Sequence, residues 1–127
     1  MEINFENFSK FNIQVGTIIK IEDNVKARKP AYVIDVDFGK IDGIKKSSAQ
    51  VTKYTKDELL NKKVIAVTNF PKKNIAGVIS EILILGAITG EDVKLLGVDS
   101  NVEEGTKIGW CLKHLLLENW MELYLVY

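Results

Sequence analysis

The sequence contains few of the residue types that carry most enzyme chemistry. Its 127 residues include one cysteine, Cys111, and one histidine, His114. A single cysteine excludes an intramolecular disulfide and fits a reducing compartment. A structural zinc site normally requires four nitrogen or sulfur ligands. No Gly-x-Ser-x-Gly or phosphate-loop motif occurs in the sequence. The chain is therefore expected to be non-catalytic and to bind neither a metal ion nor a cofactor.

Membrane and export signals are also missing. No apolar run approaches the roughly 18 residues that span a bilayer. The first ten residues, MEINFENFSK, lack the basic start and apolar stretch of a secretory signal. These features predict a cytoplasmic protein that does not interact with membranes. The length favours one folded domain, placed at residues 1–109, followed by a tail at 110–127.

Net charge is zero, and Arg28 is the single arginine, yet the charges are unevenly distributed along the chain. Residues 20–73 hold 13 of the 17 basic residues and 7 of the 17 acidic ones, so this segment carries +6 and the remainder −6. Such asymmetry indicates one basic face. A solvated lysine-rich surface is the alternative interpretation, because lysine is mostly found exposed.

Alternating apolar residues predict strands at residues 13–21, 32–38 and 44–52, with Gly16 marking a bulge or tight bend. A capping box, Thr55 to Glu58, starts a short helix. Further strands are expected at 64–68 and 82–87, with 93–98 as a sixth strand or an extension. The predicted order is three strands, then a short helix, then two or more strands. This is the order of an OB-fold, a five-stranded Greek-key β-barrel. The fold class is therefore predicted as all-β.

Lysines cluster in segments that connect the predicted strands. The candidate cations for contacting nucleic acid are Lys26, Arg28 and Lys29 in the first loop, Lys45 and Lys46 on the third strand, and Lys72 and Lys73 after the fourth. Adjacent strand residues point to opposite faces, so only one of Lys45 and Lys46 can join the binding face. A lysine contacts phosphate as a point charge and does not read geometry as the planar guanidinium of an arginine does. A binding face with lysines and a single arginine is therefore expected to have modest affinity and weak base specificity.

The most informative segment runs from Val64 to Gly86, VIAVTNFPKKNIAGVISEILILG. Its pattern V-x-V-x-N-[LF]-x-x-x-x-[IL]-x-G-x-x-S-E resembles the tRNA-binding domain family. Other parts agree: residues 11–18 resemble the family's opening strand, 44–51 its CsaA branch, and 102–108 its closing turn. The resemblance covers roughly residues 8 to 109. It implies an OB-fold with a C-terminal β extension, binding of tRNA or structured RNA, and a homodimer.

The resemblance also places Asn69, Ser80 and Glu81 on the RNA-facing surface. The residue types allow this, since a hydroxyl can bond phosphate or a 2′-hydroxyl, and a carboxylate can accept from a base amino group or orient a lysine. Local contacts of Ser80 and Glu81 within the protein are the alternative. Asn69 is also suited to hold its loop through bonds to the backbone. The family's common methionine is Leu83 here, as in the CsaA branch.

Both ends of the chain are rich in apolar side chains. Phe5, Phe8 and Phe11 recur every three residues, so one helical turn would gather them for a dimer interface, a peptide groove or a cap on the barrel. In the tail, a helix would align one apolar stripe for packing against the barrel, a partner subunit or a groove: Leu112, Leu116, Trp120, Leu123 and Tyr127.

The family resemblance supplies two alternative functions. One is a secretion-related chaperone for apolar segments of unfolded proteins, and the other a detached appendage of an aminoacyl-tRNA synthetase.

Overall fold

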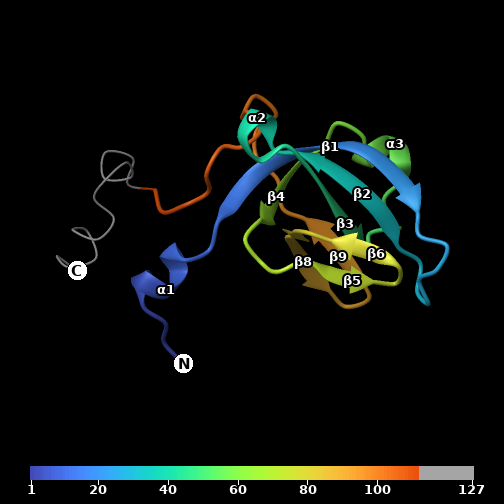
Figure 1. Ribbon diagram of the computed structural model, residues 1–127, viewed down its shortest axis with the longest axis horizontal. Helices are drawn as coiled ribbons and strands as arrows, with labels where there is room; N and C mark the ends of the chain where they lie inside the picture. The colour runs from blue at the N-terminus through green and yellow to red at the C-terminus, as the bar shows by residue number, and fades with distance from the viewer. Residues whose placement is uncertain (112–127) are drawn as a thin grey trace.

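Five antiparallel strands form one strongly curled sheet in a computed structural model that describes residues 1–111. Their order is β3-β2-β1-β4-β7, and the sheet wraps into a nearly closed barrel (Figure 1). The strands are β1 (Ile13–Asp23), β2 (Tyr32–Asp37), β3 (Ile44–Ala49), β4 (Lys63–Val67) and β7 (Leu83–Ile84). This architecture confirms the predicted OB-like fold. The apolar stripe predicted for the tail lies outside the described residues.

Short helices and two hairpins complete the described chain. The helices are α1 (Phe5–Ser9), α2 (Gly39–Asp42) and α3 (Lys56–Leu59). One hairpin pairs β5 (Lys73–Ile75) with β6 (Val78–Ser80), and the other pairs β8 (Gly86–Thr89) with β9 (Asp92–Leu95). No helix in this part of the chain is long and apolar enough to cross a membrane.

The alternation that predicted the second strand also builds the core. Tyr32, Ile34, Val36 and Phe38 are buried, whereas the residues between them are partly exposed. Side chains of an antiparallel strand point alternately to its two faces, so this pattern supplies one wall of the barrel interior. The opposite walls contribute further fully buried residues: Ile18, Leu59, Val64 and Ile82.

Helix α3 begins at the predicted capping box. The Thr55 hydroxyl accepts from the Glu58 amide at 3.1 Å, and the Glu58 carboxylate accepts from the Thr55 amide at 2.9 Å. The second bond is the main reason that the pKa of Glu58 is lowered. These bonds satisfy amides that the first helical turn leaves without partners. They orient a short helix whose Leu59 is fully buried in the core.

Removing this cap is expected to destabilise the protein measurably. Thr55→Ala should lower the free energy of unfolding by about 1 kcal/mol, the usual cost of losing a Ser or Thr cap. Urea denaturation checks this, with Thr52→Ala, a nearby exposed threonine, as the matched control. An equal loss in both variants would show that the cap contributes nothing.

Three sequence predictions about local structure need correction. The irregularity in β1 lies between Ile18 and Lys20, not at Gly16. Gly16 is instead required for close packing, since a Cβ there would lie 2.4 Å from a methyl carbon of Val36. The connection predicted as a plain hairpin at residues 39–43 contains the helical turn α2.

The third correction concerns residues 82–87, which do not form one strand. The Leu85 amide donates to Ile65 of β4, but the Leu85 carbonyl accepts from Leu96. The chain therefore leaves the barrel after Ile84 and enters the β8–β9 hairpin. In the same region, Lys73 belongs to hairpin β5–β6 and not to an irregular loop.

Candidate nucleic-acid interface

A cleft of about 650 Å³ lies between the β1–β2 loop, residues 24–31, and hairpin β5–β6. We call it the basic cleft, because three of its lining residues are cationic and none is acidic. Its walls combine these cations with small apolar and neutral polar side chains: Lys26, Ala27, Arg28, Lys29, Ala31, Ser48, Gln50, Ile75 and Ala76. The first cluster of predicted binding residues thus lies together in one concave surface.

Backbone bonds around Asn24 hold the β1–β2 loop in shape. The Asn24 amide donates to Ala31 O at 3.0 Å, which closes the base of the loop. The Asn24 side chain accepts from the Lys26 amide at 3.2 Å, and its carbonyl accepts from Ala27. An asparagine that bonds the backbone two residues on is typical of a turn. The loop consequently presents Lys26, Arg28 and Lys29 as exposed side chains.

Hairpin β5–β6 forms the facing wall. Its turn residues Ala76 and Gly77 both have positive φ, 50° and 84°, as the tightest hairpin turns require. The Asn74 side chain accepts from the Gly77 amide at 3.0 Å. The Lys26 stem crosses this turn, with its Cδ 3.0 Å from where a Gly77 Cβ would lie. The glycine therefore permits close contact between loop and hairpin.

Lys45 and Lys46 lie on opposite faces of β3, as predicted for adjacent residues of a strand. Lys46 forms an ion pair with Asp35 across the outer face, with a distance of 3.0 Å from Nζ to Oδ1. Lys45 is paired in register with Val36, whose side chain points into the core. Of these two lysines, Lys46 thus lies on the outer face that continues toward the cleft.

Glu81 connects β3 with the segment that carries Lys72. Its amide donates to Lys46 O at 2.8 Å, and its carboxylate accepts from the Lys46 amide at 3.2 Å. The other carboxylate oxygen lies 3.7 Å from Lys72 Nζ. This arrangement favours the interpretation that Glu81 orients a lysine. Lys73 is exposed at the start of β5.

Ser80 is buried between the edge strands of the barrel. Its hydroxyl oxygen lies 3.3 Å from the Ser47 hydroxyl and 3.5 Å from Ile82 O, and only 7% of the residue is exposed. The Ser47 hydroxyl also donates to Ile82 O. Ser80 thus makes the local contacts that were the alternative interpretation, and it presents no hydroxyl to a ligand in this conformation.

Asn69 fastens the N-terminal segment to the end of β4. Its side-chain oxygen accepts from the Asn12 amide at 2.9 Å, and its side-chain nitrogen donates to Lys10 O at 2.7 Å. Asn12 bonds Thr68 in turn through its side-chain nitrogen, at 2.8 Å. Both polar atoms of Asn69 are thus occupied within the protein, consistent with the holding role that its position after a strand suggested.

Loss of the Asn69 contacts is expected to loosen the N-terminal segment. Asn69→Ala should lower the free energy of unfolding by about 1–2 kcal/mol, since two hydrogen bonds of roughly 0.5–1.5 kcal/mol each are removed. Asn101→Ala, which removes an exposed amide elsewhere, is the control for chemical denaturation. Proteolysis near residue 10 should also become faster in Asn69→Ala alone. Equal stability of the two variants would contradict the fastening role.

The three N-terminal phenylalanines do not share one helical turn. Helix α1 ends at Ser9, so it holds Phe5 and Phe8, whose ring centroids are 6.1 Å apart. Phe5 also lies 5.6 Å from the Trp110 ring. Phe11 instead packs beside Phe70, at 6.2 Å, and both rings remain nearly half exposed.

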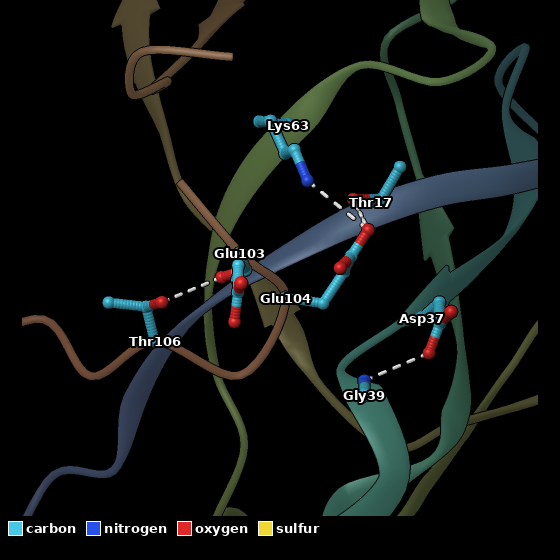
Figure 2. A network of polar contacts seen from close by, with 7 residues as sticks. All are labelled: Thr17, Asp37, Gly39, Lys63, Glu103, Glu104 and Thr106. Carbon is cyan, nitrogen blue, oxygen red and sulfur yellow. Dashed lines mark hydrogen bonds and ion pairs between the residues drawn. The ribbon is translucent and has the colours of Figure 1, made fainter. Parts of the chain in front are cut away.

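A polar network that the sequence reasoning missed closes the opposite end of the barrel (Figure 2). One Glu104 carboxylate oxygen accepts from the Thr17 hydroxyl at 2.8 Å and from Lys63 Nζ at 3.2 Å. The Thr17 bond, the backbone amide and Lys63 together lower the pKa of Glu104 to about 2. Next to it, the Gly105 amide donates to Val15 O at 2.8 Å. The network therefore attaches the closing turn to β1 and β4.

The lowered pKa of Glu104 predicts an acid-sensitive contribution to stability. The folded state favours the charged carboxylate, so the contribution is complete above pH about 4.5 and is lost as pH falls toward 2. The side chain is 34% exposed, so solvent screening reduces the contribution to about 1–2 kcal/mol. Glu104→Gln should be destabilised by about this amount at pH 7 and by less at pH 3. Urea denaturation with Glu103→Gln as control checks this, and a loss independent of pH would contradict it.

Within residues 1–111, no three histidine, cysteine, aspartate or glutamate side chains form a group that could hold a metal ion.

Comparison with known proteins supports a nucleic-acid-binding role. Residues 13–107 match the family described as putative tRNA binding domain. The CsaA chaperone protein from Picrophilus torridus is 56% identical in sequence, with a TM-score of 0.81 over 85% of this chain and 100% of that one. The chaperone CsaA from Bacillus anthracis is 40% identical, with a TM-score of 0.80 over 86% of this chain and 100% of the other. The resemblance to the CsaA branch is thereby confirmed.

A similar domain occurs within a larger enzyme. The methionine–tRNA ligase of Pyrococcus horikoshii is 41% identical over 107 residues, which make up 84% of this chain and 14% of the ligase. The chain thus spans only a small part of this relative, and the similarity concerns a domain rather than the whole enzyme.

Proposed function

Because this chain belongs to the tRNA-binding domain family, we propose that it is a non-catalytic cytoplasmic protein that binds tRNA or structured RNA through the basic cleft. The observation that carries the proposal is the convergence of Lys26, Arg28 and Lys29 on one concave surface whose lining contains no acid. Each cation that meets a phosphate releases counterions from the RNA, which favours binding.

The hairpin extends this surface along one rim. Lys73 begins β5 and Lys72 directly precedes it, and Lys46 lies on the adjoining outer face. Lys46 and Lys72 have acidic partners, so RNA phosphates compete with Asp35 and Glu81 for them. Asn69, Ser80 and Glu81 act indirectly, by holding the strands and loops that carry the cations. Lys45 contributes least, because its register places it beside the core.

Binding of bulk tRNA across a salt series tests the proposal. The affinity should fall steeply with salt, and Lys72→Ala combined with Lys73→Ala should weaken binding and flatten this dependence. The matched control is Lys40→Ala with Lys107→Ala, which removes the same charge from other exposed positions. Absence of tRNA binding at low salt would refute the proposal.

The proposed assembly is a homodimer formed through the N-terminal aromatic residues. Phe11 and Phe70 form a tilted aromatic pair, and the two residues are 47% and 45% exposed, beside helix α1 with Phe5 and Phe8. Exposed aromatic pairs of this kind are typical of protein interfaces. Sedimentation of Phe11→Ser with Phe70→Ser should show monomer, whereas Ile41→Ser, at an exposed position on α2, should leave the assembly unchanged. Identical sedimentation of the two variants would exclude this interface.

One observation favours a second function, the chaperone. A groove of about 420 Å³ lies where edge strands β3 and β7 fail to close the barrel, and it is lined by Ile82, Leu83, Ile88, Val93 and Leu95 among others. An apolar segment of an unfolded protein fits such a lining.

A third candidate function is an appendage of an aminoacyl-tRNA synthetase, which the similarity to part of a methionine–tRNA ligase suggests. Co-purification of a synthetase with this protein would distinguish this function from the other two.

A further inference from the structure

The lining of the basic cleft includes two polar side chains, Ser48 and Gln50, that make no hydrogen bond within the described residues. Ser48 lies on the outer face of β3 and Gln50 directly follows that strand. Among the described residues, the Gln50 amide and the Ser48 hydroxyl have no hydrogen-bond partner. By contrast, the neighbouring Ser47 hydroxyl is buried and donates to Ile82 O. Gln50 is exposed, so its donor and acceptor atoms are available to a ligand.

The surroundings of Gln50 combine the features that one nucleotide requires. Lys26, Arg28 and Lys29 stand on one wall, where they can meet a phosphate. Ile75 and Ala76 on the facing hairpin supply an apolar surface for the flat side of a base. The Gln50 side-chain amide, with one acceptor oxygen and two donor hydrogens, also lines the cleft. Charge, apolar contact and hydrogen-bonding capacity therefore occur together in a single cleft.

The size of the cleft and the position of Gln50 favour an unpaired nucleotide over a duplex. The volume of about 650 Å³ falls within the roughly 300–1,000 Å³ of small-ligand sites. In an RNA duplex the Hoogsteen edge of a base lies in a deep, narrow major groove that side chains cannot read, whereas an unstacked base exposes that edge. A groove that is open at both ends would suit a duplex better than a cleft walled by loop and hairpin.

We propose that the basic cleft accepts one unpaired nucleotide of the RNA and that Gln50 discriminates between bases by bonding the base edge. The inference rests on the proposed RNA binding and deepens it. On its Hoogsteen edge adenine presents the N6 donor beside the N7 acceptor, which one glutamine amide can bond together, and uracil has no such pair on that edge, so adenine is the preferred base. Ser48 supports this contact from the neighbouring position, and the cations supply affinity without selecting the sequence.

Fluorescence anisotropy with labelled six-nucleotide RNAs tests the proposal. The probes are oligo(A), oligo(U) and a fully paired duplex with the same number of phosphates. Wild-type protein should prefer oligo(A) over oligo(U) by about fivefold or more, the lower end of what one bidentate contact provides. Gln50→Ala should reduce this preference to near unity and leave the salt dependence unchanged. The duplex should bind more weakly than either single strand, and Arg28→Ala should weaken oligo(A) and oligo(U) similarly and lower their salt slope.

Controls separate this inference from the proposed function. Asn101→Ala removes an exposed amide elsewhere and should keep the base preference, and thermal melting verifies that each variant is folded. If tRNA binds but wild type shows no base preference, or Gln50→Ala retains it, the inference is overturned and the proposed function stands. If no RNA binds to wild-type protein at low salt, the proposed function itself fails.

Discussion

Replacing Lys26, Arg28 and Lys29 together with alanine is expected to lower the affinity for tRNA by roughly 10- to 100-fold near physiological salt. The three side chains line one cleft and are exposed, so their removal takes away most of its positive potential. If each contacts one phosphate, the slope of log affinity against log salt should fall by about 2 to 3. Filter binding or anisotropy with bulk tRNA measures both quantities.

The control for this variant is a change of equal charge elsewhere. Lys10, Lys40 and Lys107 are exposed and none of them lines the basic cleft. Their triple alanine variant should retain affinity within about threefold, because the general attraction of a small protein to RNA changes little. Equal losses in the two triple variants would mean that binding depends on net charge and not on the cleft.

The largest effect on stability is expected for Gly105→Ala. Gly105 has a φ of +85°, and a Cβ there would lie 2.6 Å from the carbonyl oxygen of Phe38. Alanine would therefore meet both an unfavourable backbone conformation and a backbone clash, which together should cost about 2–4 kcal/mol. The substitution also displaces the turn that Glu104 fastens to β1. Chemical denaturation at neutral pH gives the loss directly.

Gly90→Ala separates the clash from the backbone strain. Gly90 also has a positive φ, +62°, but a Cβ there meets no atom within 4 Å. Only the conformational cost of about 1–2 kcal/mol remains for this variant. If the two variants were equally stable, the close approach of Gly105 to Phe38 would not matter for the fold.

Much of the fold could be predicted, because it depends on local chemistry. The alternation of Tyr32, Ile34 and Val36 specifies a strand with one buried face. The capping box at Thr55 and Glu58 involves residues three positions apart, so their spacing alone indicates the helix start. The break after Ile84 was not predictable in this way, since it depends on where Leu85 finds backbone partners across the barrel.

The candidate site also contains some residues that local sequence could identify and others whose contacts depend on residues far away in sequence. The cations of residues 24–31 were identifiable, because a polar loop between two strands lies on the surface. The burial of Ser80 and the bonds of Asn69 depend on Ser47 and Asn12, which are 33 and 57 positions away in sequence. The Thr17–Glu104 contact spans 87 positions. No spacing rule connects such residues, so these polar groups could be assigned only after the barrel was described.

Mapping the tRNA-bound surface by NMR chemical-shift changes tests the central claim most directly. If tRNA binds in the basic cleft, amide signals of residues 24–31, 48–50 and 73–80 should shift or broaden on titration. Signals of residues 39–43 and 102–106, at the opposite end of the barrel, should stay unchanged (Figure 1). Changes confined to that opposite end, or to residues 82–88 and 93–95 of the apolar groove, would contradict binding in the basic cleft.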